Sequence, residues 1–312
     1  MHPAFSVIFL TTLIGVGQGL FLALYMAELG ALFGWLPAPS TRFYVLGSVI
    51  TLAFLLAGLV ASFFHLGRPE RAWRAAAMWR TSWLSREVIV LPAFMALVFS
   101  YGALHYTQSH VTVGVGAAAA VMCLALFICT AMIYACIRFL QEWASSLTLI
   151  NFTLFGAASG YTLAAAYAYL EAPALAGTYA PTAVALTLLA CCARIASLRR
   201  NARIRPRSSL QTAIGIKHPQ IAQKAQGFMG GSFNTREFFH GRTIAVVRAV
   251  KWSFLLLVFP APIVLLAAGM YASSITLTAA AFVAQYTGLL AERWYFFAQA
   301  RHPQNLYYQA IS

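Results

Sequence analysis

Residues 112–136 read TVGVGAAAAVMCLALFICTAMIYAC, a stretch without a single charged side chain. About 20 apolar residues are what an α-helix needs to cross roughly 30 Å of hydrocarbon. A membrane-spanning strand would alternate apolar and polar residues, and this stretch does not alternate. The stretch therefore predicts a transmembrane helix.

Similar stretches recur along the chain and predict eight spans, at residues 5–27, 44–64, 87–104, 112–136, 147–170, 179–198, 252–272 and 275–298. Hydrophobic residues make up 61% of the 312 positions, charged residues make up 9%, and aspartate is absent. This composition lies well outside that of a soluble globular domain. We predict an all-α integral membrane protein, a single polytopic domain over residues 1–312 that is surrounded by membrane lipid.

The charged residues are predicted to lie almost entirely on one side of the membrane. Eight spans put both termini on the same side, which we call the first side; the opposite side is the second side. Every Lys and Arg except Arg42 is assigned to a first-side loop or terminus. Cytoplasmic loops carry an excess of Lys and Arg, so both termini are predicted to be cytoplasmic. A basic surface complementary to an acidic partner protein is the competing explanation.

The longest predicted connection, residues 199–250, is basic and contains SFNTREFFHG at 232–241. Disordered segments lack aromatic residues, so the phenylalanines here are expected to be buried against helix ends or a partner protein. A flexible basic tether at the lipid headgroups is the alternative. The formal charge of +14 would suggest nucleic acid in a soluble protein, but the basic residues lie between spans, and no nucleic acid partner is predicted.

Histidines and cysteines predict neither haem nor another metal site. None of the seven histidines is expected well inside a span: His65 closes the second span, and His105 and His110 are assigned to a second-side connection. The five cysteines lack the spacing of a zinc or iron–sulfur site, so we expect them to be structural.

Few polar residues are predicted inside the spans. Gln18 lies near the middle of the first span, where it either packs helices together or binds a ligand. Glu28 and Glu292 are expected near span ends, as interfacial or locally paired residues. Gly15 and Gly19 form a small-xxx-small pair that allows close helix approach. A transporter would be expected to carry ionisable groups near the midplane, yet here they lie at the rims.

The densest cluster of chemical groups lies between the second and third spans. It contains FHLGRPERAWRA at 64–75 and SWLSREV at 82–88. Reduction or oxidation of a quinone requires an apolar slot, hydrogen-bond donors and groups that exchange protons with water. His65, which titrates near neutrality, and Glu87 fit the last two needs. An interfacial belt of tryptophans with snorkelling arginines is the alternative.

These two motifs and SFNTREFFHG resemble the membrane-anchor subunits of dimethyl sulfoxide reductase-type complexes, and the likeness covers the whole chain. The resemblance implies partners: a four-cluster iron–sulfur subunit and a molybdopterin catalytic subunit, which exchange electrons with ubiquinone or menaquinone through the anchor. It also implies a quinone site at His65 and Glu87, to which we add Arg68, Arg71 and Gln18. Docking to the partners is expected at Arg74, Arg86, Phe233, Asn234, Arg236 and Phe238.

The charge asymmetry bears on the substrate of such a complex. The resemblance implies a bacterial inner membrane, and cytoplasmic basic loops would put the catalytic partners in the cytoplasm. Dimethyl sulfoxide reductase faces the periplasm, whereas similar anchors serve cytoplasm-facing, quinone-linked sulfite dehydrogenases. We therefore expect sulfite oxidation with quinone reduction. The alternatives are an anchor for a dimethyl sulfoxide or related reductase that oxidises menaquinol and, from another class, an anion transporter.

Overall fold

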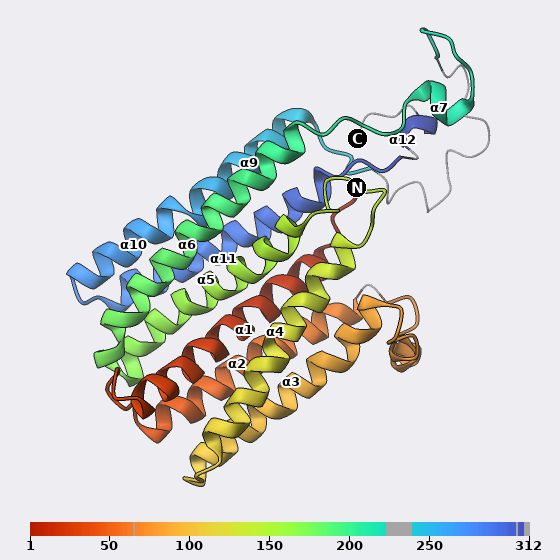
Figure 1. Ribbon diagram of the computed structural model, residues 1–312. Coiled ribbons are helices and arrows are strands. Elements are labelled where there is room, and N and C mark those ends of the chain that lie inside the picture. Colours follow the sequence, from red (N-terminus) through yellow and green to blue (C-terminus); the bar gives the residue numbers. More distant parts are fainter. Residues whose placement is uncertain (65, 223–238, 304, 309–312) are drawn as a thin grey trace.

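A computed structural model describes residues 1–64, 66–222, 239–303 and 305–308. Across these ranges the structure is helical, with no strand. The long helices run side by side, and both termini lie at the same end of the bundle (Figure 1). They are α1 (Phe5–Leu32), α2 (Thr41–Phe63), α3 (Trp83–Tyr106), α4 (Thr112–Ala135), α5 (Ser146–Glu171), α6 (Pro173–Ala202), α9 (Ile244–Val258), α10 (Pro260–Tyr271) and α11 (Ile275–Ala298).

Within the described residues, seven stretches are long and apolar enough to cross a membrane: each of α1 to α6, and α9 together with α10. Residue Phe259 separates α9 from α10, because Pro260 and Pro262 follow it and proline cannot continue the hydrogen bonding of a helix. The remaining long helix, α11, has 24 residues and contacts α9, α10 and α5. Its buried Gln285, Glu292 and Arg293 make it less apolar. The described residues thus contain seven such stretches where the sequence predicts eight spans, and α11 is the long helix at the position of the eighth.

Serine residues mark where several of these helices begin. Ser40, Ser82, Ser145 and Ser274 each accept a hydrogen bond from a backbone N–H of the following turn. The first N–H groups of a helix have no partner within the helix, so such caps fix its start. The span ends are therefore set by short polar residues as well as by apolar length.

The basic connection after α6 is shorter than predicted. Helix α6 continues to Ala202 and α9 begins at Ile244, so the helices include residues that the sequence pattern assigns to the loop. Arg200 holds the end of α6 by donating to the backbone oxygens of Gln141 and Ala144, at 3.0 and 3.2 Å. Cations also stabilise the C-terminal end of a helix. Between the two helices the structure describes the short helix α7, Leu210–Ile214, and α12 (Asn305–Tyr308) lies near the C-terminus.

Helices α1 and α5 are the most buried spans, and they cross at very short range. The predicted pair on α1 faces a second pair on α5: Gly15 and Gly19 lie against Gly156 and Gly160. A Cβ atom on Gly19 or Gly160 would collide with the backbone of the other helix. The close approach therefore depends on these glycines, as predicted for a small-xxx-small pair.

Candidate functional site

The connection between α2 and α3 projects from the first-side end of the bundle (Figure 1). It contains a short 3-10 helix, η1, over Pro69–Ala76. Arg68 and Arg71 are exposed on this connection, and the Arg71 guanidinium lies 3.8 Å from the carboxylate of Glu70. His65, the histidine of the motif, lies outside the described residues. The two arginines are thus accessible from the first side.

Three arginine–tryptophan pairs make the same region basic and aromatic. We call them the Arg–Trp surface: Arg74 over Trp73, Arg80 over Trp79 and Arg86 over Trp83, at 5.4, 5.3 and 4.2 Å from guanidinium carbon to ring centroid. Arg86 also donates to the backbone oxygens of Trp79 and Arg80, at 2.9 and 2.8 Å. Stacked pairs of this kind are typical both of membrane interfaces and of protein contacts.

Glu87 lies beneath this surface, close to the first-side end of α3. The cap at Ser82 fixes the start of the helix, which puts Glu87 at the second turn, with its carboxylate toward α4. There the hydroxyl of Thr130 donates a hydrogen bond to Glu87 Oε1. Glu87 is only 6% exposed. A buried carboxylate costs several kcal/mol unless it is paired or hydrogen-bonded. The hydroxyl of Thr130 supplies such a hydrogen bond to Glu87.

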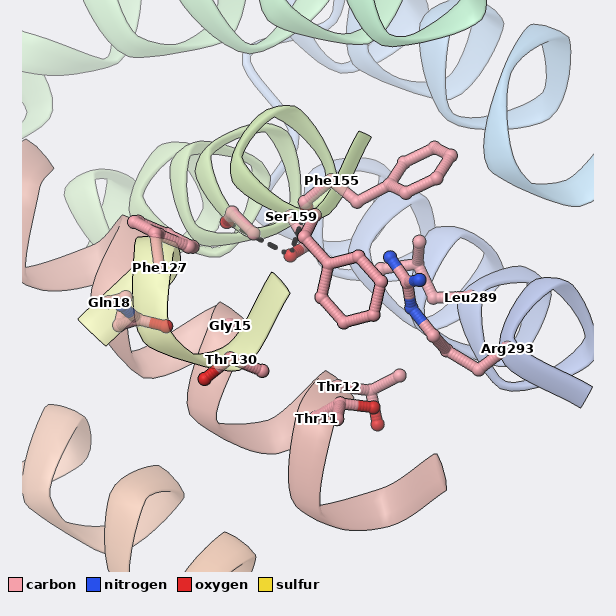
Figure 2. Close-up of a pocket in the computed structure, with 12 residues that line it drawn as sticks. Thr11, Thr12, Gly15, Gln18, Phe127, Thr130, Phe155, Ser159, Leu289 and Arg293 are labelled. Atoms are coloured by element: carbon pink, nitrogen blue, oxygen red, sulfur yellow. Dashed lines mark hydrogen bonds between the residues drawn. The ribbon is translucent and has the colours of Figure 1, made fainter. Parts of the chain in front are cut away.

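A small polar cavity adjoins Thr130 inside the first-side half of the bundle (Figure 2). Its volume is about 20 Å³, which is enough for one water molecule. The walls come from α1, α4, α5 and α11, and their polar members are Thr11, Thr12, Gln18, Thr130, Ser159 and Arg293. Gln18 also donates to the backbone oxygen of Cys123 at 2.8 Å, so it ties α1 to α4. Gln18 therefore combines helix packing with a place in the cavity wall.

A buried ion cluster lies on the far side of the cavity from Thr130. Glu292 on α11 is paired with Arg194 on α6 at 2.7 Å and with its neighbour Arg293 at 3.4 Å. All three residues are at most 4% exposed. The Arg293 guanidinium also lies 3.6 Å from the ring centroid of Phe152. Arg194, counted among the first-side basic residues although it falls within the predicted span 179–198, is thus part of the helical core. The adjacent Glu292 and Arg293 inside an apolar span were the one sequence signal for this cluster.

A second buried ionisable pair lies at the opposite end of the bundle. His105 Nε2 is 3.4 Å from the carboxylate of Glu28, and the histidine ring stacks on Tyr44 with centroids 4.0 Å apart. Tyr101 meets the same ring edge-on at 4.6 Å. The sequence pattern assigns His105 to a connection, but α3 continues through it because these partners bury the side chain. Glu28 is locally paired, in agreement with one of its two expected roles.

A larger hollow opens at the first-side end, beside the C-terminal part of the chain. It measures about 670 Å³ and lies between the ends of α6 and α11, the α4–α5 connection and the start of α9. Its charged lining residues are Glu142, Arg207, Lys251 and Arg301. The hollow and the Arg–Trp surface thus give this end of the molecule two basic features.

The predicted site residues are only partly brought together. Gln18 and the Glu87 partner Thr130 share one cavity, whereas Arg68, Arg71 and Arg74 are exposed on the connection between α2 and α3, and Arg86 lies half-buried in the first turn of α3. The docking candidates Phe233, Asn234, Arg236 and Phe238 lie outside the described residues, as does His65. Sequence reasoning missed Thr130, since a threonine in an apolar span carries no signal of its own. Within the described parts of the chain, no three His, Cys, Asp or Glu side chains group as metal ligands.

These features define a polytopic membrane subunit whose polar and charged groups lie mainly at one end. The family described as "DMSO reductase anchor subunit (DmsC)" matches residues 1–300, and the chain belongs to this family. It is a membrane anchor subunit. Over the full length of both proteins it is 56% identical to a sulfite dehydrogenase subunit from Allochromatium vinosum.

Proposed function

We propose that this chain anchors a sulfite dehydrogenase in the membrane and passes its electrons to quinone. The observation that carries the proposal is the full-length similarity to a sulfite dehydrogenase subunit. In the overall reaction, sulfite and water give sulfate, two electrons and two protons, and a quinone takes up two electrons and two protons to become quinol. Molybdopterin and iron–sulfur clusters in the partner subunits supply the sulfite oxidation and the electron transfer.

The quinone site of this proposal lies at the first-side end of α2 and α3. His65, Arg68 and Arg71 provide hydrogen-bond donors for the quinone oxygens. Glu87 is the group that hands protons to the reduced quinone, since a carboxylate near the membrane surface can exchange protons with water. The burial of Glu87 supports this role, because intramembrane carboxylates are costly and are typically functional.

The partner subunits of the proposal dock on the same end of the molecule. Arg74 and Arg86 belong to the Arg–Trp surface, and the further docking candidates are Phe233, Asn234, Arg236 and Phe238. Cationic and aromatic side chains are enriched in protein interfaces, and a basic surface is complementary to an acidic one. We therefore expect the iron–sulfur subunit to present acidic residues to the Arg–Trp surface.

The expected orientation places both termini and the docking end in the cytoplasm of a bacterium, with the bundle in the inner membrane. A reporter enzyme fused after Ser312 that is active only in the periplasm should be inactive, and one active only in the cytoplasm should be active. The reason is the excess of Lys and Arg on the first side. The opposite pattern would contradict the cytoplasmic orientation and favour a periplasm-facing reductase of the dimethyl sulfoxide type.

Purification from native membranes tests the function itself. Molybdenum and iron should co-purify with the chain in a fixed ratio, and the complex should reduce a quinone when given sulfite. Dimethyl sulfoxide reduction by menaquinol, measured on the same preparation, is the control for the other family activity. A chain that purifies without either metal and moves anions across vesicle membranes would instead support the transporter alternative.

A further inference from the structure

We propose that Thr130 is a positioning residue for Glu87 and that the cavity beside it holds the water molecule next in the proton path. The inference rests on the proposed function, because it assigns Glu87 a proton-transfer role. It adds a residue on another helix and a place for water inside the bundle.

The hydrogen bond between Thr130 and Glu87 differs from those of most other buried hydroxyls in the bundle. Thr130 lies on α4 and Glu87 on α3, so the bond joins two spans, and both residues are buried. Many other buried threonine and serine hydroxyls in the bundle donate to a backbone oxygen of their own helix, as Thr162 does to Ala158 at 2.9 Å. Thr130 donates instead to a carboxylate. Its oxygen keeps lone pairs that can accept from a water molecule.

The cavity walls offer a water molecule both hydrogen-bond donors and acceptors. Thr11 and Ser159 already donate to backbone oxygens, so toward the cavity they offer acceptors. Arg293 is the charged donor in the wall. A water molecule there can accept from Arg293 and donate to the hydroxyl oxygens, which gives it the two to four polar partners that a buried water needs. A proton then has a hydrogen-bonded route between this water and Glu87 through the hydroxyl of Thr130.

Glu87 has ionisable neighbours on its own helix and on α4. Arg86 precedes Glu87 on α3, and α4 contributes Thr130 and, within electrostatic reach of Glu87, Cys129 and Tyr134. Arg293 on α11 lies within electrostatic reach of Tyr134 and lines the cavity beside Thr130. The described part of α2 in the first-side half, residues 52–63, has no ionisable side chain. Burial of Glu87 favours the neutral acid, and the hydrogen bond that the Thr130 hydroxyl donates favours the carboxylate, so Thr130 acts on the proton equilibrium of this side chain.

Replacement of Thr130 tests the inference in the assembled complex. A hydrogen bond donated to a carboxylate favours its ionised form, so Thr130→Val should move the pH dependence of quinone-coupled turnover to higher pH, by about one unit. Thr130→Ser keeps the hydroxyl and should restore the parental profile. Thr162→Val, which removes a buried hydroxyl bonded within its own helix, is the matched control and should leave the profile unchanged. Turnover with a soluble dye acceptor should be the same in all of them.

The outcomes separate this inference from the proposed function. If Thr130→Val keeps the parental pH profile, or if Thr130→Ser shifts as far as Thr130→Val, the positioning role is wrong. If Glu87→Gln leaves quinone turnover intact, the proposed quinone site is wrong and the inference falls with it. If Thr130→Val prevents assembly, Thr130→Ala provides the same test without a branched apolar group, and an unshifted profile there overturns the inference.

Discussion

Glu87→Gln is expected to lose quinone-coupled turnover by about 100-fold or more, while the complex still reduces a soluble dye acceptor with sulfite. Glutamine occupies nearly the same volume and can still accept from Thr130, but it cannot take up or release a proton. General acid–base groups contribute about 10²- to 10⁴-fold to a rate. Steady-state assays with a water-soluble quinone and with the dye, on the same preparation, measure both activities.

Two further variants complete this experiment. His65→Arg should show the same separation of quinone and dye activities. Glu171→Gln makes the same chemical change at the second-side end of α5, where Glu171 pairs with the exposed Arg42 at 3.3 Å, and should leave both activities unchanged. Unchanged quinone turnover in both Glu87→Gln and His65→Arg would overturn the quinone site.

Glu292→Gln is expected to have the largest effect on stability, about 3–5 kcal/mol of the free energy of unfolding. Glu292 lies between Arg194 and Arg293, so a neutral residue there leaves two buried guanidiniums without a counter-charge. Breaking a buried ion pair by removing one partner has a cost of this size because the remaining charge stays desolvated. Thermal unfolding of the purified protein in detergent, followed by circular dichroism, measures the loss.

Glu171→Gln is again the matched control, because Arg42, the ion-pair partner of Glu171, is largely exposed to solvent. Exposed pairs contribute little to stability, so its unfolding midpoint should stay close to that of the parent. An unfolding midpoint for Glu292→Gln as high as that of Glu171→Gln would show that the buried ion cluster does not stabilise the bundle. The burial of these three charged residues would then have to serve a purpose other than stability.

In the Glu87–Thr130 pair, one residue could be singled out from the sequence and the other could not. Glu87 stands out because it ends a charged motif at the edge of an apolar span. Thr130 does not, because threonines are common in spans and only the rotation of α4 about its axis turns this one toward α3. Arg194 falls within the predicted span 179–198, but its burial could not be predicted, because its partner Glu292 lies on a helix that is distant in sequence.

The sequence by itself determined that this chain is a bundle of membrane-spanning helices with its charge at one end. Both properties are local, since apolar length and the positions of Lys and Arg can be read along the chain. Only the tertiary structure decided which polar side chains meet inside the bundle. The Thr130–Glu87 bond, the cavity and the ion cluster each join helices that are distant in sequence, and their partners follow from helix rotation and packing, which no local pattern specifies.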